Sequence, residues 1–258
     1  MAQAKTAVAH KPVWIDLSSH DAAGSRAFYA NLFGWKIEVS DDPQYGGYAT
    51  AKSGGRDVAG IGPAMSADAP TAWSVYIGST DAADTAKKAE AAGGKIVVAP
   101  MEVGEQGTMV VIQDPSGAFL GVWQAKNMSG FHEGAPNSFG WAELSARGID
   151  KAVPFYKKVF GWGEKKSEMS PGQPYTEFLA GGESIAGAME MNPMVPAEVP
   201  SYWLAYFNVD DVDQSFKHAT DSGAKAMLAP QDIPGGRFAI LSDPQGAAFG
   251  LLKMKAQS

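Results

Sequence analysis

The chain has no cysteine among its 258 residues and few basic residues. The lack of cysteine excludes disulfides, thiolate zinc sites and cysteine nucleophiles, and it is typical of a reducing compartment. The 21 Lys and Arg residues are outnumbered by 28 Asp and Glu residues, which gives a formal net charge of −7. Because nucleic-acid phosphates are bound by clustered positive charge, we expect no nucleic-acid partner.

Long apolar runs are also missing. No run approaches the roughly 18 residues that a membrane-spanning helix needs. The N-terminal stretch MAQAKTAVAHKP lacks the sustained apolar core of a signal peptide. With 45% hydrophobic residues, 30 Gly and 16 Pro, the composition is typical of a soluble globular protein. We therefore expect a cytoplasmic protein without a membrane partner.

The two halves of the chain repeat one another. The stretch FYANLFGW at 28–35 returns as FYKKVFGW at 155–162, with five of eight positions identical at an offset of 127 residues. The Asp-Pro-x-Gly turns that begin at Asp114 and Asp243 repeat at an offset of 129. The segment 126–138 is rich in Gly, Pro, Asn and Ser, as linkers are. We predict homologous domains at 11–125 and 139–255, joined by this linker.

Each half shows a further repeated pattern. A short apolar run at 12–18 predicts a strand, and Asp21 is a suitable N-cap for a helix that ends before Gly34. Three short strand-like runs follow at 35–40, 48–51 and 58–61. The same order then recurs from about residue 73, and again twice in the second half, where Pro154 requires its helix to begin shortly before it. The pattern predicts an α+β protein of four βαβββ modules.

This order, with the segments WIDLSSHDAAGSRAFYANLFGW and WAELSARGIDKAVPFYKKVFGW, resembles the vicinal oxygen chelate superfamily. That superfamily contains glyoxalase I, bleomycin-resistance proteins and extradiol dioxygenases. The duplication is similar to a tandem two-domain subgroup that includes a mycobacterial antigen and actinobacterial proteins labelled hydroxylases or glyoxalases. The resemblance implies that the two modules of each domain curl a mixed sheet into a cup. It predicts the fold more specifically than the function, because this fold supports lyases, dioxygenases and binding proteins.

Metal-dependent members of the superfamily hold their ion on the first strand, on the strand that opens the second module, and on the last strand. The resemblance places these ligand positions at Trp14 and Trp141, near Ser74 and Leu204, and at Gly121 and Gly250. None of these side chains is a usual ligand for a divalent ion, so we expect no metal and no other cofactor. The simpler alternatives are that both glycines mark bulges or close backbone approaches and that both tryptophans are core residues.

In place of a metal site, we expect each cup to form an aromatic pocket that contains one acidic side chain. Strand alternation places Trp14, Asp16 and Ser18 on one face, and the repeat places Trp141 and Glu143 likewise. The predicted ligand-binding residues are Trp14, Asp16, Tyr76, Phe119, Gly121, Trp123, Trp141, Glu143, Tyr206, Gly250 and Leu252. Asp16 and Glu143 are also candidate general bases, or hydrogen-bond acceptors for a ligand. Alternatively, these carboxylates point outward or pair with Lys or Arg.

Three functional hypotheses remain open. The first is a metal-free protein that binds a small apolar or aromatic molecule for sequestration, antibiotic resistance or secondary metabolism. The second is an enzyme of the same superfamily, either a glyoxalase-type lyase, a hydroxylase or a dioxygenase-like protein. The third is a protein-interaction scaffold. We expect the partner to be a small-molecule ligand. We expect the protein to be a monomer of two pseudo-symmetric domains or a homodimer.

Overall fold

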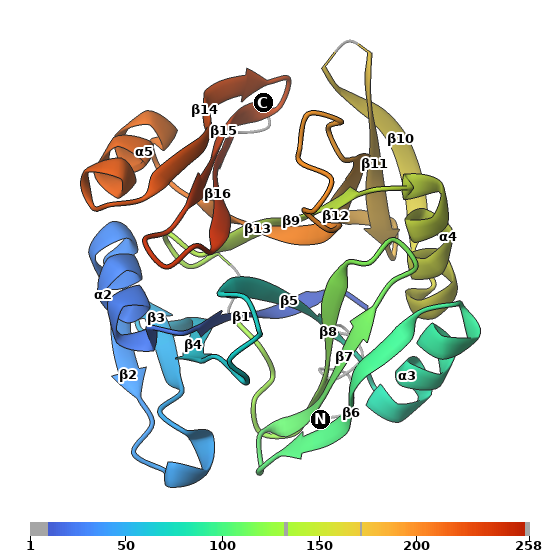
Figure 1. Cartoon of the computed structure of the whole chain (residues 1–258), viewed down its shortest axis with the longest axis horizontal. Coiled ribbons are helices and arrows are strands. Elements are labelled where there is room, and N and C mark those ends of the chain that lie inside the picture. The colour runs from blue at the N-terminus through green and yellow to red at the C-terminus, as the bar shows by residue number, and fades with distance from the viewer. Residues whose placement is uncertain (1–9, 132–133, 171, 256–258) are drawn as a thin grey trace. The chain divides into compact units, whose positions relative to one another are not determined.

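The computed structural model of the protein describes residues 10–131, 134–170 and 172–255. Its strands and helices follow the order βαβββ four times, as the sequence predicts (Figure 1). The module boundaries differ from the predicted ones by only a few residues. The prediction of four repeated modules is therefore confirmed.

The first half contains two of these modules. The first consists of β1 (Pro12–Ser19), α2 (Ala22–Phe33), β2 (Lys36–Val39), the 3-10 turn η1 (Pro43–Tyr45), β3 (Ala49–Ser53) and β4 (Arg56–Pro63). The second consists of β5 (Ala72–Gly78), α3 (Ala82–Ala91), β6 (Lys95–Val103), β7 (Gly107–Gln113) and β8 (Phe119–Ala125).

The second half repeats the arrangement. Its first module consists of β9 (Phe139–Ala146), α4 (Ile149–Phe160), β10 (Gly163–Ser170), β11 (Gln173–Ala180) and β12 (Glu183–Glu190). Its second consists of β13 (Tyr202–Asn208), α5 (Val212–Asp221), β14 (Lys225–Ile233), β15 (Gly236–Ser242) and β16 (Ala248–Met254).

Each half forms its own mixed sheet of eight strands. The strand order is β2-β3-β4-β1-β5-β8-β7-β6 in the first sheet and β10-β11-β12-β9-β13-β16-β15-β14 in the second. In both sheets, the first strand of the half pairs in parallel with the last strand of its own module, as β1 does with β4 and β9 with β12. The protein is thus an α+β chain of two tandem domains, each with one curled sheet.

The compact units of the chain combine modules from both halves. Unit 1 contains Val75–Gly130 and Trp141–Trp203 together with the chain up to Trp14. Unit 2 contains Ile15–Ser74, Phe131–Gly140 and the chain from Leu204 onward. Within unit 1, α3 contacts α4, and within unit 2, α2 contacts α5. The predicted boundary within 126–138 stays a prediction.

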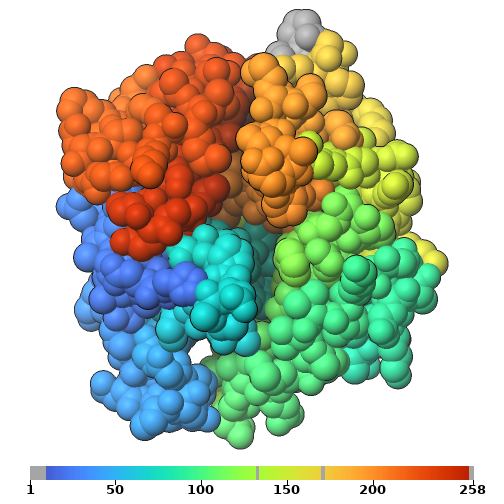
Figure 2. Space-filling view, viewed as in Figure 1, coloured from blue at the N-terminus to red at the C-terminus, as the bar shows by residue number. Residues whose placement is uncertain are grey.

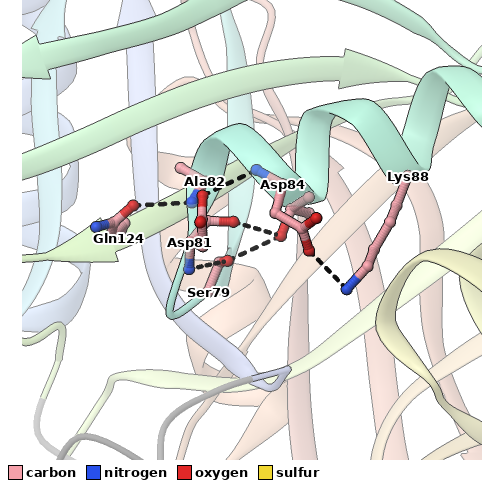
Figure 3. Close-up of polar contacts among 7 residues, drawn as sticks. Ser79, Asp81, Ala82, Asp84, Lys88 and Gln124 are labelled. Atoms are coloured by element: carbon pink, nitrogen blue, oxygen red, sulfur yellow. Dashed lines mark hydrogen bonds and ion pairs between the residues drawn. The ribbon is translucent and has the colours of Figure 1, made fainter.

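Capping side chains determine where the helices begin. The carboxylate of Asp81 accepts a hydrogen bond from the backbone N–H of Asp84 at 2.8 Å, as an N-cap does (Figure 3). The Gln124 side chain accepts another from the N–H of Ala82 at 2.8 Å, and Lys88 pairs with Asp84 one turn later. Figure 3 shows these contacts together at the start of α3. Asp21 and Asp211 cap α2 and α5 in the same way.

The helix that contains Pro154 is capped differently. It begins at Ile149 after Gly148, and the carboxylate of Glu190 accepts hydrogen bonds from the N–H groups of both residues, at 3.0 and 2.8 Å. Pro154 therefore lies in the second turn, where its ring removes one early backbone hydrogen bond. No helix among the described residues combines the length and apolar character needed to cross a membrane.

Two outer strands each contain a proline. β6 extends over Lys95–Val103, well beyond the apolar run at 96–98. The extension includes Pro100, and the register of β6 against β7 shifts on either side of Val98. β6 lies at the edge of its sheet, where the missing proline N–H interrupts no second ladder. β14, with Pro230, has the same position and the same irregular register in the other sheet.

A buried tyrosine–aspartate pair lies in each unit. In unit 2, the hydroxyl of Tyr29 on α2 donates to Asp243 at 3.0 Å and accepts from the indole N–H of Trp73 at 2.8 Å. In unit 1, Tyr156 donates to Asp114 at 2.8 Å and accepts from the indole of Trp203 at 2.8 Å. The tyrosine of each Phe-Tyr motif thus contacts the Asp-Pro turn of the other half of the chain.

Aromatic side chains surround both pairs. Tyr29 is fully buried, and its ring meets Phe33, Trp35, Phe207 and Phe249. These residues come from both halves of the sequence, so the core of unit 2 is formed jointly. Their burial, with about 25 cal/mol for each Å² of apolar surface removed from water, is the main stabilising contribution to this core.

Candidate functional site

A carboxylate on the first strand of each half is held by a tyrosine. In unit 2, Asp16 on β1 is partly buried, and the hydroxyl of Tyr48 donates a hydrogen bond of 2.6 Å to its Oδ1. Asp16 lies opposite Gly60 in the parallel pairing of β1 with β4. A Cβ at Gly60 would overlap both the Tyr48 hydroxyl and the Asp16 carboxylate. We call Asp16, Tyr48 and Gly60 the Asp16 cluster.

The second half repeats this arrangement in unit 1. Glu143 on β9 lies opposite Gly187 on β12, and a Cβ at Gly187 would overlap the ring and hydroxyl of Tyr175. The indole N–H of Trp141 donates to the Tyr175 hydroxyl at 2.9 Å. We call Trp141, Glu143, Tyr175 and Gly187 the Glu143 cluster. In both clusters the glycine provides the space in which a phenol reaches the strand carboxylate.

Burial and charge determine the protonation of the phenol in the Glu143 cluster. Burial raises the pKa of Tyr175 well above its ordinary value, and the charge of Glu143 raises it further. The hydrogen bond from Trp141 acts in the opposite direction but is weaker. Glu143 itself is 7% exposed. Tyr175 therefore stays protonated at neutral pH and acts as a hydrogen-bond donor to Glu143.

Tyrosine rings also explain the two glycines in the last strands. Gly121 on β8 lies opposite Tyr76 on β5, and a Cβ at Gly121 would overlap the Tyr76 ring. Gly250 on β16 and Tyr206 on β13 have the same relationship. Each glycine is thus required by a ring on the neighbouring strand of its own unit. This geometry favours the alternative that Gly121 and Gly250 mark places where a neighbouring group approaches the backbone closely.

The remaining predicted site residues differ in exposure. Trp14 is 4% exposed, whereas Trp141 is only partly buried. Phe119 is 49% exposed, and the indole N–H of Trp123 donates to the carbonyl of Met128 at 2.9 Å. Leu252 lines an open pocket of about 230 Å³. The structure brings Trp141 and Glu143 into one cluster through Tyr175, and the binding roles of all these residues stay predictions.

The donor atoms in these clusters do not fit a divalent metal site. Among the described residues, no group of three or more His, Asp or Glu side chains lies close enough to hold an ion. Each cluster offers one carboxylate and a protonated phenol, and the positions that the resemblance assigns to ligands carry Trp and Gly.

None of the three histidines that the structure describes belongs to a group of side chains that could hold a metal ion. The ring Nε2 of His20 lies 2.7 Å from the carbonyl oxygen of Ala69, and that of His218 lies 3.2 Å from the carbonyl oxygen of Asn31. Burial and the nearby positive charge of Lys88 lower the pKa of His10. His132 lies outside the described residues.

Sequence reasoning missed the tyrosines and glycines of the two clusters. The signal was present, because Tyr48 and Tyr175, and likewise Gly60 and Gly187, are separated by the same offset of 127 residues as the Phe-Tyr motifs. Alternation along one strand gave the two carboxylates as candidates. It could not identify a partner that comes from another strand of the sheet.

The model of the Glyoxalase/Bleomycin resistance protein/Dioxygenase superfamily matches residues 11–122 and 138–251. The chain belongs to this superfamily. The two matches cover most of the chain and show that the superfamily unit occurs twice in tandem. This result confirms the resemblance that the repeated Phe-Tyr and Asp-Pro segments carry.

Two relatives match the chain over nearly the full length of both proteins. The chain is 38% identical over 257 residues to "Putative glyoxylase CFP32" of Mycobacterium bovis, with 95% of each chain covered. It is 35% identical over 259 residues to "Anthracycline biosynthesis protein DnrV" of Streptomyces peucetius, covering 95% of this chain and 93% of the other.

Two solved structures have the same fold as this chain. The 2,3-dioxygenase LapB of Pseudomonas sp. KL28 matches with a TM-score of 0.67 at 14% identity, covering 97% of this chain and 95% of the other. The Mn(II)-bound glyoxalase of Novosphingobium aromaticivorans matches with a TM-score of 0.62 at 17% identity, covering 95% and 82%. At such low identity these matches show the fold alone.

Proposed function

We propose that the protein binds a small, largely apolar or aromatic molecule at the Asp16 and Glu143 clusters. The observation that supports this most is the repeated acid–tyrosine pair. In each half, a glycine at the equivalent position of the neighbouring strand leaves space for the phenol. Such a pair offers one oriented polar anchor beside aromatic surface, the combination that small-molecule sites use for orientation and affinity. The partly exposed indole of Trp141 supplies a ring face on which a ligand can stack.

The role of such binding is sequestration, resistance or secondary metabolism. One relative is named as an anthracycline biosynthesis protein, which supports a place in secondary metabolism. The proposal needs no metal, because the carboxylate and the phenols provide the polar contacts. It assigns Asp16 and Glu143 the role of hydrogen-bond acceptors for a ligand.

A second candidate is an enzyme of the same superfamily. It is favoured by the contact of each carboxylate with a phenol, because a carboxylate can act as a general base while a nearby phenol donates a proton. The relative named as a glyoxylase supports a lyase reaction. A protein-interaction scaffold is the third possibility, and no observation on the described residues favours it.

The experiment is a screen for aromatic ligands, followed by Asp16→Asn and Glu143→Gln. Both replacements keep an oxygen that can accept the tyrosine hydrogen bond but remove the negative charge. If the clusters only bind, each replacement weakens the affinity for a ligand by about 1.5–3 kcal/mol, near the value of one charge-assisted hydrogen bond. If a cluster is catalytic, the same replacement lowers turnover by about 10²–10⁴ with a smaller change in affinity. A ligand that binds undiminished to both variants would favour the scaffold.

A further inference from the structure

An open cavity of about 230 Å³ lies within unit 2 and shares no residue with the Asp16 cluster. Its three walls are residues 135–137, the end of β13 at 208–210 and the end of β16 at 252–254. The chain from residue 204 onward, which supplies two of these walls, is drawn in orange to red and reaches the viewed surface (Figure 2). The volume exceeds the roughly 150 Å³ of a cavity that takes up benzene, so a small organic molecule fits.

Hydrogen bonds hold the walls of this cavity in place. The backbone N–H of Asn208 donates to the carbonyl of Ser138 at 2.9 Å. Asn137 has a left-handed φ of +48°, which asparagine adopts more readily than most residues. Its carbonyl accepts from the indole of Trp35 at 2.7 Å, and its side-chain amide donates to the carbonyl of Phe33 at 3.0 Å. The cavity is therefore preformed, and a ligand orders little of the chain when it binds.

The side-chain amide of Asn208 is packed against a glycine. A Cβ added at Gly140 would overlap both the oxygen and the nitrogen of this amide. The first half has the reverse arrangement, because β5 ends at Gly78 where β13 ends at Asn208, and Val13 matches Gly140 at the offset of 127 residues. The glycine is thus on the other strand in the second half, where it leaves space for the amide.

The chain itself covers the corresponding place in unit 1. Trp123, which corresponds to Leu252, donates its indole N–H to the carbonyl of Met128 at 2.9 Å. Gly130 lies directly on Val13, since an added Cβ would overlap the carbonyl oxygen of Val13. Peptide groups of the segment 128–130 therefore contact, in unit 1, the residues that correspond to Leu252 and to the glycine beneath Asn208.

The charges at the cavity balance one another. Of the described residues that line it, Asp210 and Lys253 are charged, and the Lys253 ammonium lies 3.8 Å from the Asp210 carboxylate. An exposed pair of this kind contributes little to affinity, but it leaves no net charge that would attract an ion. The exposed amide of Asn208 has a donor and an acceptor side by side. The group that matches both at once is another amide.

We propose that this cavity is a second ligand site, which binds small neutral molecules that bear an amide group. The ligand carbonyl accepts a hydrogen bond from Nδ2 of Asn208, and the ligand N–H donates one to Oδ1. The apolar part of the ligand lies against Val209 and Leu252, whose side chains line the cavity. The inference goes beyond the proposed function and does not rest on it.

The test compares pivalamide with pinacolone, which have the same shape but carry NH₂ and CH₃, respectively, beside the carbonyl. Affinities for the intact ¹⁵N-labelled protein are measured by nuclear magnetic resonance titration, from the backbone resonances of residues 252–254. Pivalamide is also expected to shift the side-chain amide resonances of Asn208, which are assigned by their loss in Asn208→Ala. That variant is expected to change the ratio of the two affinities by about 3- to 10-fold in favour of the ketone, the effect of one neutral hydrogen bond.

A second variant displaces the amide without removing it. Gly140→Ala forces the flexible end of the Asn208 side chain to move, so it is expected to change the ratio in the same direction with little cost to the fold. The control is Asn31→Ala, at an exposed asparagine of α2 that belongs to the same unit and does not line the cavity. It is expected to keep the wild-type ratio. An unchanged ratio in Asn208→Ala, or a failure of pivalamide to bind, overturns the inference and leaves the proposed function intact.

Two further comparisons test the ligand class and the location. Pivalate, the charged analogue of the same shape, is expected to bind more weakly than pivalamide, and tighter binding of pivalate would overturn the assignment of a neutral ligand. Binding of pivalamide is expected to persist in Asp16→Asn and Glu143→Gln. Loss of binding in either variant, together with full binding in Asn208→Ala, would place the amide at a cluster and overturn the second site.

Discussion

The hydroxyl of Tyr29, in the first half of the chain, donates a hydrogen bond of 3.0 Å to the carboxylate of Asp243, in the second half. Asp243 is 2% exposed, and its other oxygen accepts the N–H groups of Gln245 and Ala247. The second pair has the halves exchanged, because Tyr156 in the second half donates its hydrogen bond to Asp114 in the first half. Each half therefore supplies the partner that the other half's buried polar group requires, because an unpaired buried group is destabilising.

Removing one of these hydroxyls should destabilise the protein. Tyr29→Phe and Tyr156→Phe each leave a carboxylate oxygen and an indole N–H buried without a partner, so we expect a loss of about 1–3 kcal/mol in the free energy of unfolding. Urea denaturation followed by circular dichroism measures the change. Tyr45→Phe, at a partly exposed site, is the matched control and should change stability by less than about 0.5 kcal/mol. Equal effects at all three positions would contradict the account.

The Asp243 pair also predicts a dependence of stability on pH. Burial raises the pKa of Asp243 above its ordinary value, and hydrogen bonds from Ala247, Tyr29 and Gln245 only partly oppose this. The native state therefore holds this proton at a pH where the unfolded chain, with a pKa of about 3.9, has already released it. The contribution of Asp243 to stability is largest at low pH and falls as the pH rises from about 4 through the raised pKa.

Asp243→Asn isolates this contribution. The difference in unfolding free energy between wild type and variant, measured by urea denaturation at several pH values from 4 upward, should shrink as the pH rises. Other carboxylates titrate equally in both proteins and cancel in the difference. A difference that is constant or grows with pH would contradict the raised pKa.

The glycines beneath the two phenols should not tolerate a side chain. Gly60→Ala and Gly187→Ala place a methyl group where the hydroxyls of Tyr48 and Tyr175 lie, so the phenols must move away from their carboxylates. We expect a destabilisation of about 1–3 kcal/mol, typical of overpacking, and weaker binding at the affected cluster.

The matched control is Gly163→Ala in β10. A Cβ added at Gly163 would lie 3.4 Å from its nearest neighbour, the Cβ of Leu179, which is an ordinary van der Waals contact. This variant should retain near-wild-type stability and binding. If Gly60→Ala and Gly187→Ala behave like the control, the glycines have no role in the clusters.

Protein purified without chelator and then dialysed should contain no stoichiometric metal. The reason is the donor set, since each cluster offers a single carboxylate beside protonated phenols, which are poor ligands for divalent ions. Inductively coupled plasma mass spectrometry measures the content. Zinc, nickel, iron or manganese at one equivalent per domain would show that the proposed metal-free site is wrong.

The sequence predicted the fold well because the chain repeats and because its local signals agree. The N-cap Asp21 begins a helix where the pattern indicated, and Asp81 and Asp211 cap the corresponding helices of later modules. Strand alternation gave Asp16 and Glu143 as candidates, and their role in a site stays a prediction. The site was harder to predict, because it depends on which strands become neighbours. The ring beside Gly121 comes from Tyr76, and the phenol beside Asp16 comes from Tyr48, and both contacts follow from strand order in the sheet.

The central claim is that an aromatic ligand binds at the acid–tyrosine clusters, and Trp141 reports on it directly. Its indole N–H donates to Tyr175, so its proton resonance is sensitive to any molecule that enters the Glu143 cluster. The measurement is a nuclear magnetic resonance titration of the intact protein with 1-indanone, in which Trp141→Leu assigns the resonance by its loss. The account predicts a saturable shift of the Trp141 indole resonance that Glu143→Gln weakens. Saturable binding that shifts other indole resonances while that of Trp141 stays in place would contradict it.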